Sequence, residues 1–342
     1  MAIIHITNSC NLQCEFCWHH SPLQKSHVKP LSLNLPILVS MFKDLAAMGT
    51  KEICLNAQGE PSSHPQFAEI VNTIKETGMS LKIHTNLALY SPKIISAFER
   101  ADHLVINLSA VDEKSYRKIH APLNKHSFKN VLKNISHIVS INKRFGNPHF
   151  EIIYIITKNN FRQIGQAIEL ARSNGIPSIS FKILQTTSST QKLHFNHQQR
   201  IHFLKDIALL MRQSTGIRTN LKDVFDEFFT KRNVSIPFEH CYIGWLTIYI
   251  KQNGIVGLCC QNGRLTIGDW RENTLREIWN GSRAQQLRLL AKDHLHLKSP
   301  FGDTCQHCCY SITNANIEKM LARIPHQPYS IAATKKIRLI QT

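Results

Sequence analysis

Three cysteines near the start of the chain have the residue types and spacing of metal ligands. Cys10, Cys14 and Cys17 form a Cys-x3-Cys-x2-Cys run. Thiolates are soft ligands that favour iron–sulfur clusters and zinc, and three of them can hold three irons of a [4Fe–4S] cube. Three protein ligands also leave one metal position open, where a substrate or cofactor can bind. The alternative is a zinc site whose fourth ligand is His19 or His20.

A second group of cysteines, in the last third of the chain, predicts a site with a complete set of four ligands. The stretches 247–251 and 255–258 predict a hairpin with an Asn-Gly turn, which would bring the cysteines at its two ends together. One cysteine of each adjacent pair, 259/260 and 308/309, is expected to be a bystander, because neighbouring side chains rarely point the same way. Four thiolates suit one fully ligated cluster or a zinc ribbon, and the predicted ligands are Cys241, Cys259, Cys305 and Cys308.

The composition predicts a cytoplasmic metalloprotein without a membrane span. The N-terminus lacks the basic start of a signal peptide, and the apolar stretch 241–250 is too short to cross a bilayer. The net charge is +18, from 41 Lys and Arg against 23 Asp and Glu, which favours an anionic substrate or partner. The charge is dispersed along the sequence, so nucleic-acid binding is considered and not favoured.

The elements that must position these cysteines follow a βα pattern over the first half of the chain. Short β-branched runs alternate there with amphipathic segments, which predicts a parallel sheet with right-handed crossovers. Six such units are too few for an eight-stranded barrel, so we predict an α/β fold, a partial (β/α)6 TIM-like barrel. The first cysteine run follows the first strand, at the end of the sheet where sites gather. The predicted strands are 3–7, 52–56, 81–85, 103–108, 151–157 and 179–184.

The rest of the chain predicts a smaller unit behind the barrel. A Ser- and Thr-rich linker begins near residue 185, and two helices are expected at 197–213 and 221–231. The predicted organisation is a barrel over 1–190, a helical connection over 191–236, a small C-terminal auxiliary-cluster domain over 237–315, and a helix with a basic tail over 316–342.

The first cysteine run, with Phe16 before its third cysteine, resembles the signature of the radical S-adenosylmethionine (radical SAM) enzymes. The turn Gln58-Gly59-Glu60-Pro61 resembles the Gly-Gly-Glu-Pro turn of that family, with Gln58 in place of the first glycine. The resemblance implies that the open iron binds the amino and carboxylate groups of SAM and that the turn binds its amine through the backbone.

The same resemblance implies further SAM contacts at the strand ends. Asn86 and Ser109 follow the third and fourth strands, and Asn159 or Asn160 follows the fifth; the alternative for each is a turn or helix cap. The predicted cofactor-binding residues are Phe16, Gln58, Gly59, Glu60, Asn86 and Ser109.

The C-terminal cysteines and the run Ile267-Gly268-Asp269 resemble the SPASM or twitch auxiliary-cluster domains. No cysteine follows Cys309, so one auxiliary [4Fe–4S] cluster is expected. The resemblance implies an enzyme that reductively cleaves SAM to a 5′-deoxyadenosyl radical, with flavodoxin or ferredoxin as the reductant. That radical would take a hydrogen atom from a small polar, sugar-like substrate, in a dehydrogenation or an epimerisation.

Three other functions are weighed against this one, and a non-catalytic iron–sulfur or zinc scaffold is the third of them. A ribosomal-peptide or protein maturase is the first alternative, although no peptide-recognition domain is seen before the first strand. An RNA-modifying enzyme is the second and rests on the net charge. For epimerisation, Cys54 on the second strand is the candidate hydrogen-atom donor; the alternative is a small core residue.

Overall fold

The computed structural model covers the barrel and most of the C-terminal part of the chain. It describes residues 1–24, 29–56, 58–123, 128–145, 149–185, 187–213, 215–230, 238–260, 265–293, 305, 308 and 310–323. Cys309 and the predicted basic tail after residue 323 lie outside the described residues.

The six predicted parallel strands are present and neighbour one another in chain order. Alternating side chains on each strand face opposite sides of the sheet. In the third strand, Leu81 and Ile83 are fully buried toward the outer helices, whereas Lys82 and His84 face the inside of the curved sheet. The strands are β1 (Ala2–Ile4), β2 (Glu52–Leu55), β3 (Ser80–Thr85), β4 (His103–Asn107), β5 (His149–Ile156) and β6 (Ser178–Ile183).

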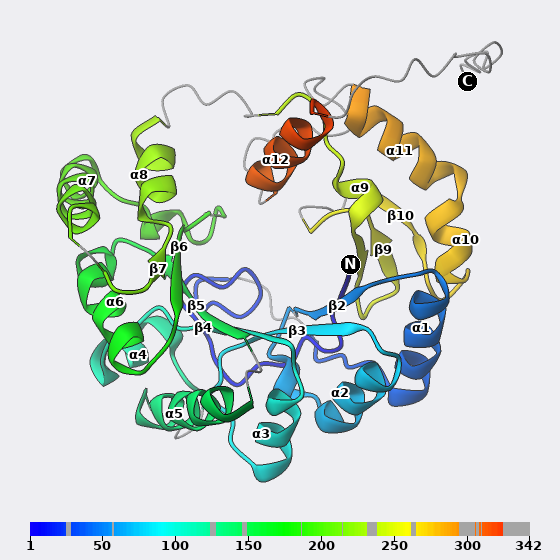
Figure 1. The fold of residues 1–342 in the computed structure, drawn as a ribbon, viewed down its shortest axis with the longest axis horizontal. Helices are drawn as coiled ribbons and strands as arrows, with labels where there is room; N and C mark the ends of the chain where they lie inside the picture. The colour runs from blue at the N-terminus through cyan, green and yellow to red at the C-terminus, as the bar shows by residue number, and fades with distance from the viewer. Residues whose placement is uncertain are drawn as a thin grey trace.

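The outer layer of the barrel consists of helices that follow the strands (Figure 1). The first of them begins after Asn34, whose side chain accepts a hydrogen bond from Ile37 N, and it buries Leu38, Phe42 and Leu45 against the sheet. The outer elements are α1 (Leu35–Ala47), η1 (Pro61–Ser63), α2 (Phe67–Glu76), α3 (Pro92–Glu99), α4 (Glu113–His120), α5 (Phe128–Phe145), η2 (Phe161–Gln163), α6 (Ile164–Ser173) and η3 (Gln191–Leu193).

The structure contains the two helices expected after the barrel strands. It contains α7 (His197–Met211) and α8 (Leu221–Thr230), with a short strand β7 (Arg218–Thr219) between them that extends the parallel sheet beyond β6. Phe195, Phe203 and Phe228 pack together here and hold the two helices on the barrel. A further parallel strand was not predicted from the sequence, because two residues give no periodic pattern.

The predicted C-terminal hairpin joins the same sheet on its other side. Strand β8 (Ile248–Ile250) runs parallel to β1, and β9 (Ile255–Gly257) and β10 (Thr266–Asp269) continue antiparallel, giving a ten-stranded order β10-β9-β8-β1-β2-β3-β4-β5-β6-β7. The Asn-Gly turn is confirmed, with Gly254 at φ +99°, a conformation that favours glycine. The remaining helices are α9 (Ile243–Leu246), α10 (Leu275–Asn280), α11 (Ser282–Asp293) and α12 (Ser311–Leu321).

Two further observations concern the helices. Helix α12 begins at Ser311, before the predicted boundary at residue 316. Among the helices that the structure describes, none has the length and apolarity needed to cross a membrane.

Candidate active site

The first cysteine run forms a loop that leaves β1 at the carboxyl end of the parallel strands. Cys10, Cys14 and Cys17 are half-buried, and a hydrogen bond from Cys17 N to Cys14 O (2.9 Å) closes a turn between two of them. The sulfur of Cys17 accepts hydrogen bonds from the backbone N–H groups of His19 (3.4 Å) and His20 (3.3 Å). Such donors stabilise a thiolate, so this loop is suited to hold a cluster.

Burial opposes ionisation of these thiols in the absence of a metal. Burial, together with the Glu60 carboxylate, raises the pKa of Cys10 to about 12, and burial also raises the pKa of Cys14 and Cys17. A bound metal cluster must therefore displace the three protons when it takes the thiolates as ligands.

A single metal ion and a four-iron cluster require different arrangements of the three cysteines. Within the part of the chain that the structure describes, no three His, Cys, Asp or Glu side chains are gathered closely enough to hold a single metal ion. A zinc ion needs its ligand atoms around one point, whereas each cysteine of a cubane binds a different corner iron.

The predicted glycine of the strand-two turn packs directly on the cysteine loop. A Cβ atom on Gly59 would lie 2.0 Å from the carbonyl oxygen of Ser9, which directly precedes Cys10. The neighbouring N–H of Glu60 donates to that same oxygen at 2.8 Å. Only glycine permits this approach, so the turn and the cluster loop form one rigid unit.

The Glu60 carboxylate ties this turn to the end of β3. Its Oε1 accepts hydrogen bonds from Ser62 Oγ (2.6 Å) and Thr85 Oγ1 (2.7 Å), and its Oε2 accepts from Asn86 N (2.7 Å). Burial raises the pKa of Glu60, and these donors act in the opposite direction. The side chain of Glu60 is thus committed to protein contacts, which leaves the backbone of the turn for a ligand.

The asparagine predicted at the end of β3 holds the cysteine loop. Asn86 Nδ2 donates to the side chain of Asn11, between the first two cysteines, at 2.8 Å, and Asn86 Oδ1 accepts from Ala88 N (2.9 Å). Asn11 was missed by the sequence reasoning, because nothing in its type or spacing marks it apart from its place in the loop.

Gln58, which stands where the Gly-Gly-Glu-Pro turn has its first glycine, forms a hydrogen bond with the C-terminal hairpin. Its Oε1 accepts a hydrogen bond from Gln252 Nε2 at 2.8 Å, and Gln252 is buried in the turn between β8 and β9. A glycine at position 58 has no side chain for this contact. The substitution therefore links the strand-two turn to the C-terminal part of the chain.

Ser109, predicted after β4, is buried between β4 and β5. Its hydroxyl accepts a hydrogen bond from Ile155 N (2.9 Å), and its carbonyl accepts one from Asn160 Nδ2 (3.0 Å). Asn159 lies apart from this pair and donates to the carboxylate of Glu15 in the cysteine loop at 2.8 Å. The ends of β4 and β5 are thus bonded to each other and to the loop.

Phe16 and His120 meet beside the cysteine loop. Their rings contact edge-to-face with centroids 5.9 Å apart. His120, the last residue of α4, lies with Nδ1 3.2 Å from the sulfur of Cys14 and accepts a hydrogen bond from Ser109 N at Nε2 (2.9 Å). Burial lowers the pKa of His120 to about 3, so its ring is neutral. No sequence signal marked this residue.

The second cysteine group also comes together. The charges of Cys241 and Cys259 add to burial in raising the pKa of Cys305 to about 12, which shows that the three sulfurs are close to one another. Cys259 packs with the main core beside them, whereas Cys260 packs on the inner face with Ile3 and Tyr249. This arrangement favours Cys259 over Cys260 as the ligand.

The inner face of the barrel carries Cys54 and a set of polar side chains. Cys54 is 4% exposed and packs against Ile3 and Tyr249, and burial raises the pKa of its thiol to about 12. Burial, with the charges of Lys82, Lys182 and His103, lowers the pKa of His84 to about 3. The alternation along β3, β4 and β6 places these four side chains on the inner face of the sheet.

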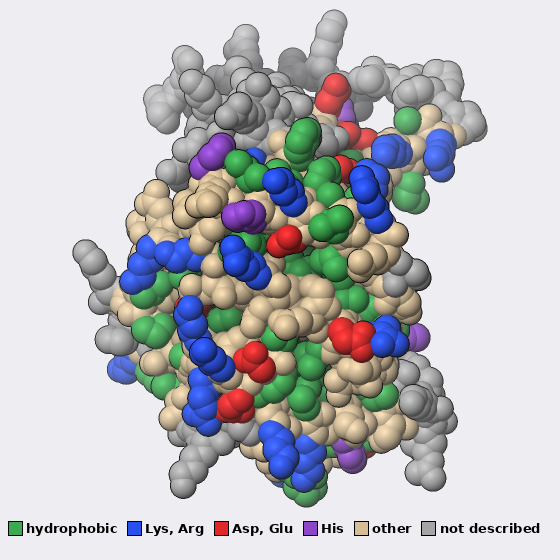
Figure 2. All heavy atoms as spheres, turned by 90° about the vertical axis from the view of Figure 1, so that its left-hand side faces the viewer, with side chains coloured by type: hydrophobic (Ala, Val, Ile, Leu, Met, Phe, Trp, Pro, Cys, Tyr) green, Lys and Arg blue, Asp and Glu red, His purple; other side chains and the backbone are tan. Residues whose placement is uncertain are grey.

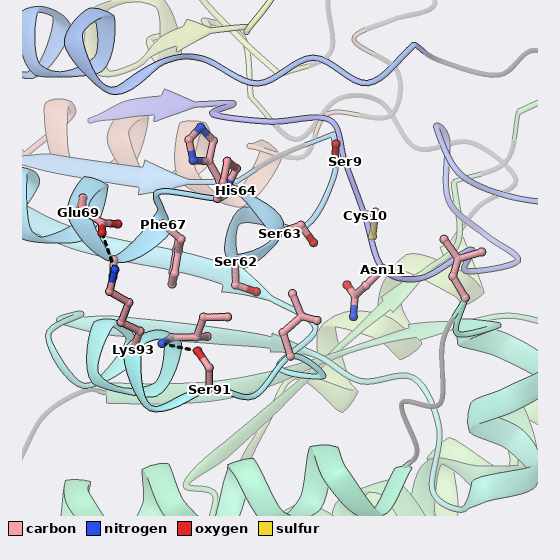
Figure 3. A pocket seen from close by; sticks show the side chains of 15 residues that line it. Ser9, Cys10, Asn11, Ser62, Ser63, His64, Phe67, Glu69, Ser91 and Lys93 are labelled. Atoms are coloured by element: carbon pink, nitrogen blue, oxygen red, sulfur yellow. Dashed lines mark hydrogen bonds and ion pairs between the residues drawn. The ribbon is translucent and has the colours of Figure 1, made fainter.

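A hollow of about 550 Å³ opens on the outer side of the cysteine loop. Cys10 and Asn11 form one wall, Ser62 and Phe67 belong to another, and the Lys93–Glu69 ion pair (2.8 Å) lies at its far end (Figure 3). Of the three cysteines in the first run, Cys10 alone lines this hollow.

The chain forms a partial parallel barrel with an open three-cysteine loop at its strand ends, and a second cysteine group follows. These features define an iron–sulfur barrel protein. The family model described as the radical SAM superfamily matches residues 4–171, and the SPASM model, described as an iron-sulfur cluster-binding domain, matches residues 241–309. The chain belongs to the radical SAM superfamily and carries a SPASM domain. Its cofactors are therefore a [4Fe–4S] cluster, SAM and an auxiliary iron–sulfur cluster.

Three known proteins illustrate the range of similar chains. An S-adenosylmethionine-dependent nucleotide dehydratase from Selenomonas ruminantium is 30% identical over 182 residues, which span 49% of this chain and 62% of that relative. The sporulation killing factor maturation protein SkfB of Bacillus subtilis is 23% identical over 85% of this chain and 67% of its own length. The structure of Streptococcus suis SuiB bound to S-adenosylmethionine superposes with a TM-score of 0.63 at 15% identity, covering 93% of this chain and 73% of SuiB.

Proposed function

We propose that this radical SAM enzyme removes a hydrogen atom from a small, polar, negatively charged substrate held in the barrel lumen. When bound, the first cluster and SAM supply a carbon radical strong enough to break an unactivated C–H bond. The observation that carries the substrate class is the cluster of Lys82, His84 and Lys182 on the inner face.

The lysines of the inner face can bind an anion, and the Glu52 and Glu151 carboxylates lie on the same face. Lys82 and Lys182 supply N–H donors for such a substrate, and a neutral His84 on the same face can donate or accept a hydrogen bond. Of the acidic residues on the same face, Glu151 accepts a hydrogen bond from Ser180 Oγ at 3.1 Å. A phosphorylated or nucleotide-linked sugar matches these groups, and the nucleotide dehydratase among the relatives supports the same substrate class.

The predicted SAM contacts remain part of this proposal. The turn at Gln58, Gly59 and Glu60 would bind SAM through its backbone, because the Glu60 carboxylate is already bonded within the protein. Phe16, Asn86 and Ser109 lie around the cysteine loop, where the two polar residues fix the loop and the strand ends that a SAM molecule would contact.

A matched pair of lysine variants tests the substrate class. Nucleoside diphosphates and their sugar conjugates serve as probes in calorimetric titrations of the reconstituted, SAM-bound enzyme. We expect Lys82→Gln to weaken binding of the accepted probe about tenfold, since one charged contact contributes about 1.5 kcal/mol or more, and Lys129→Gln, on the exposed face of α5, to leave it unchanged. Equal affinity of the two variants for the probe would refute the proposal that the lumen binds an anionic substrate.

The outcome of the radical step depends on Cys54. Its raised pKa keeps the hydrogen on sulfur, and it lies on the inner face, so we propose it as the hydrogen-atom donor of an epimerisation. The sulfur radical left on Cys54 would then take one electron from the flavodoxin or ferredoxin reductant and one proton from solvent, which restores the thiol. Solvent deuterium in the product, absent with Cys54→Ala, would support this role. Product formed one-to-one with 5′-deoxyadenosine and without deuterium would instead establish a dehydrogenation.

A second candidate function is the modification of a peptide. The match to SkfB over 85% of this chain favours it. Under this alternative, a precursor peptide stimulates 5′-deoxyadenosine formation and nucleotide sugars do not. RNA modification has weaker support, because Lys and Arg are spread with Asp and Glu between them over the face shown in Figure 2. Salt-sensitive binding to tRNA would support this function, and absence of binding at low salt would exclude it.

The hollow beside Cys10 is our proposed route for the electron. Cys10 is the ligand that this opening reaches, and it is reached from outside the lumen, so a flavodoxin or ferredoxin can dock there without blocking the substrate. Reduced thiols and such donors are typical of the cytoplasm, where we expect the enzyme to act.

A further inference from the structure

The hydrogen bonds of His120 determine which ring nitrogen carries the proton. Its Nε2 lies 2.9 Å from the backbone N–H of Ser109, which donates the hydrogen bond. A ring nitrogen that accepts a hydrogen bond carries no proton, so the proton of the neutral imidazole is on Nδ1. Nδ1 lies 3.2 Å from the sulfur of Cys14, and the N–H group therefore donates to that sulfur.

The surroundings hold this ring in place. His120 is 1% exposed, and the ring of Tyr116 contacts it at 5.1 Å between centroids. The backbone carbonyl oxygens at the end of α4 accept hydrogen bonds from the loop itself, with Glu15 N bonded to Ile119 O at 2.8 Å and Gln13 N to His120 O at 3.2 Å. These contacts use carbonyls that a helix end leaves unpaired, and they fix Cys14 against the imidazole.

The second cysteine group has the same arrangement on an unrelated helix. Asn314 of α12 is fully buried; its Oδ1 accepts a hydrogen bond from Tyr242 N (2.9 Å), which identifies the other terminal atom as nitrogen. That nitrogen donates to the sulfur of Cys241 at 3.7 Å. In each site, a neutral buried side chain is oriented by a backbone N–H and presents one N–H to a cysteine.

We propose that His120 and Asn314 are positioning residues that raise the reduction potentials of the two clusters, one cluster each. An N–H that donates to a ligand sulfur stabilises the additional electron of the reduced cluster, so the bond favours reduction. The two donors come from separate helices, and each potential is therefore set independently of the other.

Two substitutions of His120 separate hydrogen bonding from packing. His120→Gln places an acceptor near the position of Nε2 and has no donor near Nδ1, whereas His120→Asn places a donor near Nδ1. In redox titrations of the reconstituted full chain followed by electron paramagnetic resonance, we expect His120→Gln to shift the first cluster to a lower potential and His120→Asn to stay close to the wild type. Asn314→Leu should shift the auxiliary cluster alone.

A measurement on the unaltered protein supplies a second test. Histidine labelled with ¹⁵N only in the imidazole ring is used, because the backbone N–H groups of His19 and His20 also donate to Cys17. Electron–nuclear double resonance of the reduced first cluster should then detect coupling to a ring N–H whose proton exchanges in D₂O. Equal potentials in the two His120 variants, or no histidine coupling in the wild type, would overturn the proposal. Iron content is determined alongside, so failure to assemble a cluster is distinguished from a change in its potential.

Discussion

Replacement of Gly59 by alanine tests how tightly the strand-two turn is packed on the cluster loop. The new Cβ would lie 2.0 Å from Ser9 O and 2.5 Å from the Asn8 carbonyl carbon. Contacts shorter than 3.0 Å do not occur for real Cβ atoms. The two backbones must therefore separate by at least 1.0 Å, which is the difference between this 3.0 Å limit and the 2.0 Å distance to Ser9 O. Overpacking of this kind costs about 1–3 kcal/mol, and loss of the Glu60 N to Ser9 O bond adds about 1 kcal/mol.

We therefore expect Gly59→Ala to lower the free energy of unfolding by about 2–4 kcal/mol. Urea unfolding of the reconstituted protein measures this change, and equilibrium dialysis with labelled SAM is expected to show weakened binding. The matched control is Gly165→Ala in α6, where the nearest atom to the added Cβ, in Leu210, is 3.4 Å away. The control should be neutral or slightly stabilising. Stability and SAM affinity unchanged by Gly59→Ala would refute the close packing.

Two further predictions concern single side chains. Cys259→Ala should abolish the auxiliary cluster while Cys260→Ala retains it, as iron analysis and absorbance of the reconstituted variants would show; the reverse result would reassign the ligand. Burial lowers the pKa of His84 to about 3 in the folded protein, whereas the pKa of histidine in the unfolded chain is about 6.5. As the pH falls below about 6.5, the unfolded state therefore gains a proton that the folded state does not, and the protein loses stability. Between about pH 7.5 and about pH 5.5 this loss is about 1.4 kcal/mol. His84→Gln should remove that part of the pH dependence of urea unfolding and His197→Gln, at an exposed position on α7, should not; identical pH profiles for the two variants would contradict the burial argument.

The sequence was sufficient for the elements whose physical signal is local. The six barrel strands follow from alternation and β-branched runs, and the hairpin turn follows from an Asn-Gly pair that only a few turn types accommodate. Gly59 was predicted as part of the strand-two turn, but its close contact with the backbone of Ser9 was not.

Contacts between segments that are far apart in the sequence could not be predicted from such local patterns. His120 is 106 positions from Cys14, and one histidine among 19 carries no mark of its partner. The pairing of β8 with β1 likewise depends on how two segments about 245 residues apart meet. The polar lumen emerges only when residues from several strands are brought to one face, because each lysine alone is equally typical of an exposed surface.

The central claim is that Cys10, Cys14 and Cys17 hold the cluster that cleaves SAM. Its most direct test is iron and sulfide analysis of the anaerobically reconstituted protein beside the variant with all three cysteines changed to alanine, together with 5′-deoxyadenosine formation after reduction. We expect about eight irons per chain to fall to about four, because the auxiliary cluster remains. SAM cleavage should disappear, because the cluster that binds SAM is lost. Unchanged iron content, or SAM cleavage that persists in the triple variant, would contradict the account.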